Sequence, residues 1–340
     1  MERRCPGGRA DRPSVPSEGK SQEATGELVA GDIGAVSKLS SVLTGHTLCI
    51  KDDPIILLGV ESPRPSFHMA AYPKSKADVD KMTSSLARIC EEDPSLTITR
   101  EPDTLEILLG GLGDTHVDVA VEKMKRKFGV EILLELPKVP YKETIGSSAR
   151  VEYKHKKQSG GHGQYAHVCL NLEPLPRGSG FEFAQSVVGG SVPKEYIPSV
   201  GKGVQKALPG GVIAGFPVID LKATLVDGSF HTVDSSGISF EIAGGHALTK
   251  GMEQARPVLL EPIMRAQITV PDAFAGDVIG ELNSKRGRIQ GMNPQGDGTT
   301  LIETEVPQAE MLRYATELRS QSQGLGFFTM QFDHYEEGPE

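Results

Sequence analysis

Apolar residues recur at helical spacing in two segments of the chain, and strand-like runs flank them in the same order each time. Residues 66–137 and 263–332 both read as strand, helix, strand, strand, helix, strand. The first helix of each segment is marked by apolar residues three and four positions apart: Val79, Met82, Leu86 and Ile89 in one, Phe274, Val278 and Leu282 in the other. This order predicts two copies of the ferredoxin-like, split βαβ fold.

The segment between the two copies predicts a βαβ-type domain with projecting loops. Its first hairpin has the Gly-rich turn 158–164, and a long strand at 218–226 ends in a second turn at 227–231. Helices are predicted at 193–208 and from Asp234, which we expect to be the N-cap, to residue 254. If the strands 165–174 and 218–226 are neighbours, the two turns lie at the same end of the domain.

The N-terminal residues carry a different pattern. Residues 1–25 are polar and rich in Pro, Gly and Ser, so we expect them to be disordered. Short strand-like runs follow at 28–29, 31–36 and 47–50, too few to bury a core alone. The predicted fold class is therefore α+β and multidomain, with two ferredoxin-like domains flanking a βαβ-type domain, preceded by a remnant of a β-barrel.

The net charge of −9 hides an uneven distribution of basic residues. They gather at 150–157, at 123–127 and at Lys285, Arg286 and Arg288. A hairpin that joins the first cluster to the turn 158–164 presents cations and backbone amides outward, which suits a polyanion such as RNA. On local sequence alone, a flexible hairpin with a solvated charge run is the favoured interpretation. His231, beside Ser229 and Phe230, suits stacking on a base, although an exposed loop histidine without a partner is the default interpretation.

Other chemistries have weak support in the sequence. No apolar run predicts a membrane span, and the four cysteines, Cys5, Cys49, Cys90 and Cys169, are far apart, as is typical of reduced thiols in the cytoplasm. No complete phosphate-binding loop is found, so we expect no cofactor-binding residues. His155, His162 and His167 could form a metal site if 155 and 167 face each other across the hairpin, but no carboxylate or Cys is seen to accompany them, so none is expected. His231, Asp234, Ser235 and Ser236 contain the groups of a hydrolase, but read more simply as a helix start, and no catalytic residues are expected.

Several runs spread along the chain resemble bacterial translation elongation factor G. They are GDIGAV (31–36), TGHTLC (44–49), EEDPS (91–95), KMKRKFG (123–129), YKETI (141–145), KKQSGGHGQY (156–165), His231 with VDSS (233–236), PVLLEP (257–262) and GDVIG (276–280). The resemblance covers roughly residues 20–335. Asp114-Thr115-His116 departs from the family's usual Glu-Leu-His, which indicates a divergent, elongation-factor-G-like paralogue.

The resemblance implies a division into domains and a set of contacts. Residues 26–62 would be the end of the barrel domain II, 64–138 domain III, 140–258 domain IV and 260–335 domain V, after a leader at 1–25. In the family, domain IV reaches the decoding centre of the small ribosomal subunit and displaces the tRNA–mRNA pair, while domains III and V contact RNA near the factor-binding centre of the large subunit. The domain IV role maps onto Gln158, Ser159, Gly160, Gly161, His162, Gly163, Gln164 and His231, and the domain V role onto Lys285, Arg286 and Arg288.

The family's GTPase domain would lie ahead of residue 28 and is not in the sequence. We therefore expect no GTP hydrolysis by this chain alone; GTP and Mg²⁺ belong to the full-length family. The expected function is that of the ribosome-binding C-terminal half of a translocation factor, monomeric and cytoplasmic, with ribosome, tRNA and mRNA as partners. The alternatives are a ribosome recycling or protection paralogue, or an inactive truncated remnant, since a truncated gene, a fragment and a separately encoded half all fit the sequence.

Overall fold

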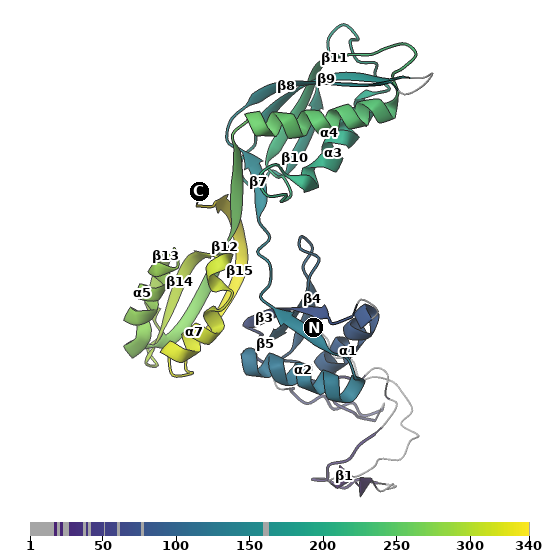
Figure 1. Ribbon diagram of the computed structural model, residues 1–340. Coiled ribbons are helices and arrows are strands. Elements are labelled where there is room, and N and C mark those ends of the chain that lie inside the picture. The colour runs from purple at the N-terminus through teal and green to yellow at the C-terminus, as the bar shows by residue number, and fades with distance from the viewer. Residues whose placement is uncertain are drawn as a thin grey trace. The chain divides into compact units, whose positions relative to one another are not determined.

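The structure is a computed structural model that describes residues 17–18, 21–22, 27–36, 39, 42–50, 52–59, 62–75, 78–158 and 163–339. The contacts within the chain divide it into two compact units. The first holds residues 1–100 and 107–135, and the second holds residues 101–106 and 136–340. Figure 1 shows the arrangement of helices and strands inside each of them.

The first unit contains a four-stranded antiparallel sheet with two helices. Its elements, in chain order, are β3 (Phe67–Pro73), α1 (Val79–Glu92), β4 (Thr97–Arg100), β5 (Ile107–Gly111), α2 (Asp114–Phe128) and β6 (Ile132–Glu135). The strand order β4-β5-β3-β6 is that of the ferredoxin-like fold, as predicted. Gly129 ends α2 in the left-handed conformation, with φ of 64° and its N–H donating to the Lys125 carbonyl. Met82, Leu86 and Ile89 of α1 are buried as predicted, whereas Val79, at the first residue of the helix, is 43% exposed.

The N-terminal part differs from the sequence prediction. Among the described residues 27–36, 42–50 and 52–59, no strand forms, and Ala35 alone takes part in a bridge. No barrel closes there. Within the segment expected to be disordered, β1 (Ser17–Glu18) and β2 (Ser21–Gln22) pair as a short antiparallel ribbon. Apart from the bridge at Ala35, the described residues of these three runs pair with no strand, and a strand without partners is not stable.

The C-terminal domain repeats the ferredoxin-like order. Its elements are β12 (Pro257–Pro271), η3 (Asp272–Phe274), α5 (Ala275–Ser284), β13 (Arg288–Pro294), β14 (Thr299–Pro307), α6 (Gln308–Met311), α7 (Tyr314–Gln321) and β15 (Phe327–Glu337). The strands follow the order β13-β14-β12-β15, all antiparallel. The second helix, predicted as continuous from Met311 to Arg319, is broken between Met311 and Tyr314 into α6 and α7.

The middle domain is a four-stranded sheet with two helices against one face (Figure 1). Its elements are β7 (Lys142–Ile145), β8 (Ala149–Gln158), β9 (Gly163–Pro174), β10 (Phe181–Gln185), α3 (Ile197–Ala207), η2 (Leu208–Gly210), β11 (Leu221–Ser229) and α4 (Gly237–Gln254). In the order β10-β11-β9-β8, β10 runs parallel to β11 and the other pairs are antiparallel. The predicted helix at 193–208 begins later, at Ile197, because Pro193 to Tyr196 form a turn.

Alternation along β9 separates its two faces. Ala166, Val168, Leu170 and Leu172 are buried in one core with Phe240 of α4. The intervening residues point to the face opposite the helices. Because β12 begins beside β7 of the middle domain and continues into the C-terminal sheet, one strand joins the two domains of the second unit. No helix among the described residues is both long enough and apolar enough to cross a membrane.

Candidate nucleic-acid interface

The two turns singled out in the sequence lie side by side, because β9 and β11 are antiparallel neighbours. The β8–β9 hairpin pairs Gln158 with Gly163, and β11 ends at Ser229 opposite His167. Beyond Ser229 the chain forms a loop, residues 230–236, which leads into α4. The neighbouring strands confirm the prediction that both turns occur at the same end of the domain.

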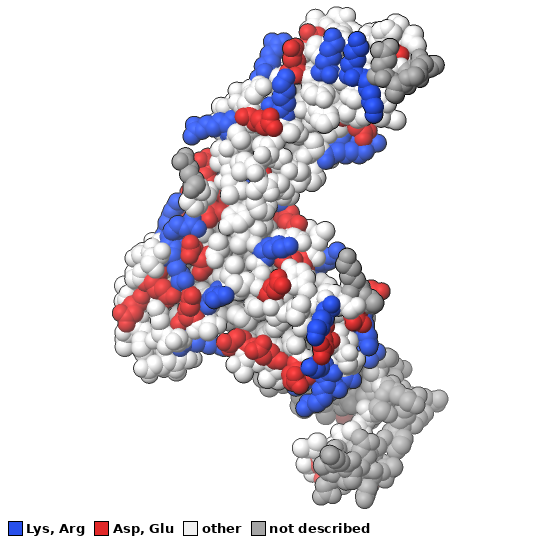
Figure 2. Space-filling view, viewed as in Figure 1, with Lys and Arg blue, Asp and Glu red and all other residues white. Residues whose placement is uncertain are grey.

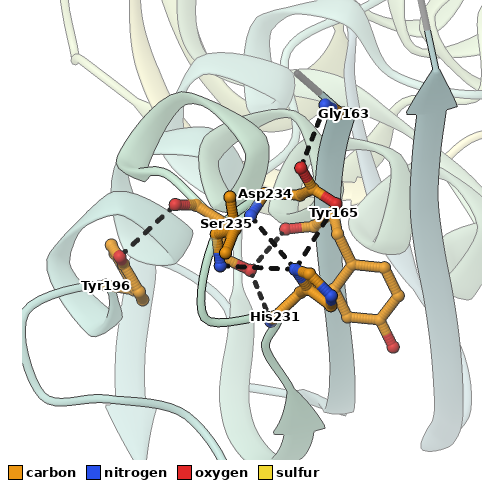
Figure 3. A network of polar contacts seen from close by, with 7 residues as sticks. Gly163, Tyr165, Tyr196, His231, Asp234 and Ser235 are labelled. Carbon is orange, nitrogen blue, oxygen red and sulfur yellow. Dashed lines mark hydrogen bonds and ion pairs between the residues drawn. The ribbon is translucent and has the colours of Figure 1, made fainter. Parts of the chain in front are cut away.

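Loop 230–236 is held against the start of β9 by three hydrogen bonds (Figure 3). The Gly163 N–H donates to Asp234 Oδ1 at 3.0 Å, and the Tyr165 N–H donates to the Asp234 carbonyl at 2.9 Å. The Ser235 hydroxyl donates to the Tyr165 carbonyl at 2.8 Å and accepts the His231 N–H at 2.9 Å. Asp234 is therefore the link between the turns. The prediction that it caps α4 is wrong, because the Ser236 hydroxyl accepts the Ser239 N–H and is the N-cap.

His231 is oriented by its own loop. The backbone N–H groups of Val233 and Asp234 donate to its Nδ1 at 3.3 and 3.2 Å. Asp234 Oδ2 lies 3.4 Å from the same nitrogen. Because Nδ1 accepts two N–H groups, the proton of the neutral ring lies on Nε2. The Asp234 carboxylate is therefore close to Nδ1 without a hydrogen bond between them. The side chain is 54% exposed, and its ring lies 6.4 Å from that of Tyr165. An oriented N–H donor next to a second aromatic ring can both stack on a base and hydrogen-bond to it.

A cleft of about 280 Å³ opens between the hairpin and the loop. Its lining combines three cations, two aromatic rings and a single acid: Lys154, Lys156, Lys157, Tyr165, His231 and Asp234, with Gly163 and Gln164. None of the ion pairs between described residues involves these three lysines. Lys154 Nζ lies over the Tyr165 ring, 5.4 Å from its centroid. Figure 2 shows Lys and Arg side chains gathered on this end of the domain.

The remaining residues predicted for the turn can be placed only in part. Ser159, Gly160, Gly161 and His162 lie outside the described residues, as does the side chain of Gln158. Gln164 Oε1 lies 3.0 Å from His155 Nε2. His155 is opposite Ala166 and His167 is opposite Lys154, so the side chains of the two histidines point to opposite faces of the sheet. The idea that they face each other is wrong.

The three cations predicted for RNA contact in the C-terminal domain are all paired with carboxylates. Lys285 Nζ lies 2.7 Å from Glu317 Oε2, Arg286 binds Glu261 through two hydrogen bonds of 2.6 and 3.0 Å, and Arg288 contacts Glu336 at 2.8 Å. Arg286 and Arg288 also line a second cleft together with four glutamates, Glu261, Glu305, Glu336 and Glu337. Acidic and basic side chains therefore face each other in this cleft, whereas the three lysines of the first cleft have no carboxylate paired with them among the described residues.

Ser235 and Ser236, considered above for a hydrolase, both act within the backbone framework. The Ser235 hydroxyl is engaged by the Tyr165 carbonyl and the His231 amide, and Ser236 caps α4. In a hydrolase of this kind, the hydroxyl group of the nucleophilic serine would hydrogen-bond to the histidine side chain, which acts as the base. His231 Nδ1 instead accepts backbone N–H groups.

Models of three protein families match consecutive parts of the chain. "Elongation Factor G, domain III" matches residues 62–135, "Elongation factor G, domain IV" matches 137–256 and "Elongation factor G C-terminus" matches 258–340. The chain belongs to the elongation factor G family. The middle domain is domain IV of that family, so the cleft described above lies in domain IV of this chain. The three matched segments do not include a GTPase domain.

Individual relatives agree with this assignment. The chain is 47% identical over 317 residues to an elongation factor G-like protein of Thermotoga maritima, an alignment that covers 93% of the chain and 46% of that relative. A crystal structure of a Thermus thermophilus protein superposes with a TM-score of 0.77 at 37% identity, covering 96% of the chain and 52% of that protein. The chain thus spans about half the length of the relatives it matches.

Sequence reasoning missed the role of Asp234. Asp234 is followed by two serines and then by an apolar helical face, a pattern typical of a helix start. Only the register of β9 against β11 shows that its carboxylate reaches a glycine 71 positions earlier. No local pattern could reveal that contact.

Proposed function

We propose that this chain is the ribosome-binding part of an elongation-factor-G-like translation factor and that the end of domain IV enters the decoding centre of the small subunit. There it would displace the tRNA–mRNA pair during translocation, which in the intact family member depends on GTP and Mg²⁺. The proposal includes a monomer acting in the cytoplasm, with domains III and V placed against RNA at the factor-binding centre of the large subunit.

The observation that carries the proposal is the cleft between the two turns. Three lysines without carboxylate partners among the described residues supply positive charge, while Tyr165 and His231 supply aromatic faces and an oriented donor. Cations that bind phosphates and rings that stack on unpaired bases are the two components of single-stranded RNA recognition. Asp234 holds the two turns together, so this surface is preformed before RNA binds.

Domain V is proposed to contribute less binding free energy per cation. Lys285, Arg286 and Arg288 would have to exchange a carboxylate for a phosphate, and that exchange cancels most of the gain. Their role in RNA contact is retained as part of the proposal. It predicts a small effect for Arg288→Ala on ribosome affinity compared with Lys156→Ala.

Cosedimentation of the full chain with small ribosomal subunits over a series of salt concentrations tests the proposal. Binding should weaken as salt rises, and Lys156→Ala should reduce the slope of log K against log salt by about 1. His231→Ala and Gln158→Ala should weaken binding with the slope nearly unchanged, because neither residue is assigned a phosphate contact through a full positive charge.

Lys206→Ala is the matched control. Lys206 belongs to α3, on the side of domain IV that the two helices cover, and its ammonium group is paired with Glu241. Its replacement should leave both affinity and slope unchanged. Binding that does not depend on salt, or that responds equally to Lys206→Ala and Lys156→Ala, would contradict an interface at the two turns. An absence of binding would instead favour an inactive remnant.

A further inference from the structure

The face of the domain IV sheet opposite α3 and α4 carries a group of metal-binding side chains that RNA contact does not require. Strands β8 and β9 pair Glu152 directly with Cys169, and Lys154 with His167. Since the alternate residues of β9 are buried against the helices, His167 and Cys169 share the opposite face with Glu152. The ligand atoms of these three residues all lie within 4.8 Å of one another.

We propose that Glu152, His167 and Cys169 form a binding site for one divalent cation of the Zn²⁺ class. His167 Nε2 lies 3.6 Å from Glu152 Oε2 and 3.7 Å from Cys169 Sγ. In a tetrahedral zinc site, with metal–ligand distances of about 2.0–2.3 Å, neighbouring ligand atoms are roughly 3.4–3.6 Å apart. The two distances from His167 are close to that geometry, and the ligand atoms of Glu152 and Cys169, which lie within 4.8 Å of each other, would come together around the ion.

The types of donor select the class of metal. A thiolate, an imidazole and a carboxylate together suit Zn²⁺ and its analogue Co²⁺, whereas Mg²⁺ and Ca²⁺ prefer oxygen ligands alone. With three protein ligands, the fourth position is left for water. Cys169 is only 7% exposed, and its sulfur has the His167 ring beside it, so the thiol is directed into the group and not toward solvent.

A hydrogen bond behind His167 prepares its ring for metal binding. Nδ1 lies 3.3 Å from the Ser229 hydroxyl, which is also 2.8 Å from the Tyr165 hydroxyl. If Nδ1 carries the proton and donates to Ser229, Nε2 keeps its lone pair toward Cys169 and Glu152. Metal-binding histidines usually have such a partner on the other ring nitrogen, which fixes the tautomer and the orientation.

The charges around the site also favour a cation. The carboxylates of Asp227 and Glu152 both interact electrostatically with the Cys169 side chain, against the single guanidinium group of Arg150. Lys154 lies next to His167 in the register, but its ammonium group is directed over the Tyr165 ring. A divalent metal ion would replace the thiol proton, so binding of one cation releases one proton from Cys169.

Titration of the full chain with Co²⁺ and then Zn²⁺ tests the site. In a background where Cys5, Cys49 and Cys90 are replaced by Ser, one equivalent of Co²⁺ should produce a thiolate-to-cobalt absorption band, and Zn²⁺ should displace it. Cys169→Ser should abolish the band. Ser229→Ala, which removes the partner of His167 and leaves the three proposed ligands in place, should lower the Zn²⁺ affinity by about 10–100-fold.

Glu152→Gln is a second test variant that should fold normally, because the Glu152 side chain is 73% exposed and its replacement leaves the core intact. It should lower Zn²⁺ affinity, whereas His155→Ala, on the other face of the sheet, should not. The proposal is overturned if the background chain gives no thiolate band. It is also overturned if Zn²⁺ binds the Cys169→Ser and Glu152→Gln variants as tightly as it binds the background chain. Ribosome cosedimentation plays no part in the readout, so the site stands or falls independently of the proposed function.

Discussion

Among single residues, Glu143 of β7 makes the most concentrated set of contacts in domain IV. Its carboxylate accepts five consecutive backbone N–H groups, from Val212 to Phe216, at 2.5 to 3.1 Å. Such a run of amides forms a concave anion site, here filled by a side chain of the same chain. The side chain is fully buried. At Gly211, where φ is 51°, a Cβ would collide with this carboxylate, which explains the glycine.

Replacement of Glu143 by Ala should therefore be among the most destabilising single changes in the domain. It leaves several buried N–H groups without an acceptor, each at a cost of about 1–3 kcal/mol, so we expect a loss of at least ~3 kcal/mol in the free energy of unfolding. Urea denaturation followed by circular dichroism measures it. Glu143→Gln, which keeps one acceptor oxygen, should lie between wild type and Ala. A loss below ~1 kcal/mol for Glu143→Ala would show that the loop finds other partners.

Glu143 also predicts a dependence of stability on pH. Burial alone would raise its pKa, but the backbone N–H groups outweigh that effect and hold the pKa below its ordinary value of 4.5. The unfolded chain therefore binds this proton more tightly than the folded chain. The contribution of Glu143 is complete above the unfolded pKa and is lost as pH falls through the folded one. The stability difference between wild type and Glu143→Gln should be largest above about pH 5 and shrink on acidification. A difference that grows toward low pH would contradict this sign.

Between elements, the link from loop 230–236 to β9 determines the candidate RNA surface. Two amides of β9 depend on Asp234 in different ways: the Gly163 N–H uses its side chain and the Tyr165 N–H uses its backbone carbonyl. A Cβ at Gly163 would lie 3.0 Å from the Asp234 carboxyl carbon, so the contact is also sterically close.

Asp234→Ala should separate these two amides in a hydrogen-exchange experiment. Exchange at Gly163 should accelerate by a factor of roughly 10 to 100, the equivalent of losing a hydrogen bond to a charged acceptor, while exchange at Tyr165 should change much less. Amide exchange followed by NMR resolves both positions. Thr232→Ala, in the same loop, is the control. Equal acceleration at both amides would mean that the whole loop had detached.

The predictable part of the fold is the part set by local periodicity. The order of strands and helices in both ferredoxin-like domains and the buried face of α1 follow from apolar spacing. The cap of α4 and the start of α3 were predicted at other residues, and the break between α6 and α7 was not predicted. Several nearby residues carry similar signals for a helix end, and the backbone hydrogen bonds decide which of them is used.

The candidate sites depend on register, which the sequence does not display. The turns could be placed at one end of domain IV only on the condition that β9 and β11 pair. The metal-binding group was missed for the same reason: Glu152 and Cys169 are 17 positions apart and become neighbours only because of the β8–β9 pairing. A one-residue shift in that register would send one of the two to the helical face.

Across the whole molecule, each of the two units has a core of its own. In the first unit Ile89, Leu96 and Ala120 form a buried cluster, and in the second a larger cluster surrounds Phe240. Domain IV and the C-terminal domain belong to the same unit, since β12 pairs with β7 at its start and with β14 and β15 further along. Unfolding of either domain therefore removes strand partners from the other.

Scanning calorimetry should accordingly show two transitions that respond to different core substitutions. Ile89→Ala should destabilise the transition of the first unit by about 2–5 kcal/mol and leave the second in place. Phe240→Ala should destabilise the second by about 3–5 kcal/mol, and the C-terminal domain should unfold together with domain IV in that transition. Val119→Ala, on the exposed side of α2, should shift neither by more than ~0.5 kcal/mol. A single transition displaced equally by Ile89→Ala and Phe240→Ala would contradict two units, and a third transition that Phe240→Ala leaves unmoved would contradict the coupling through β12.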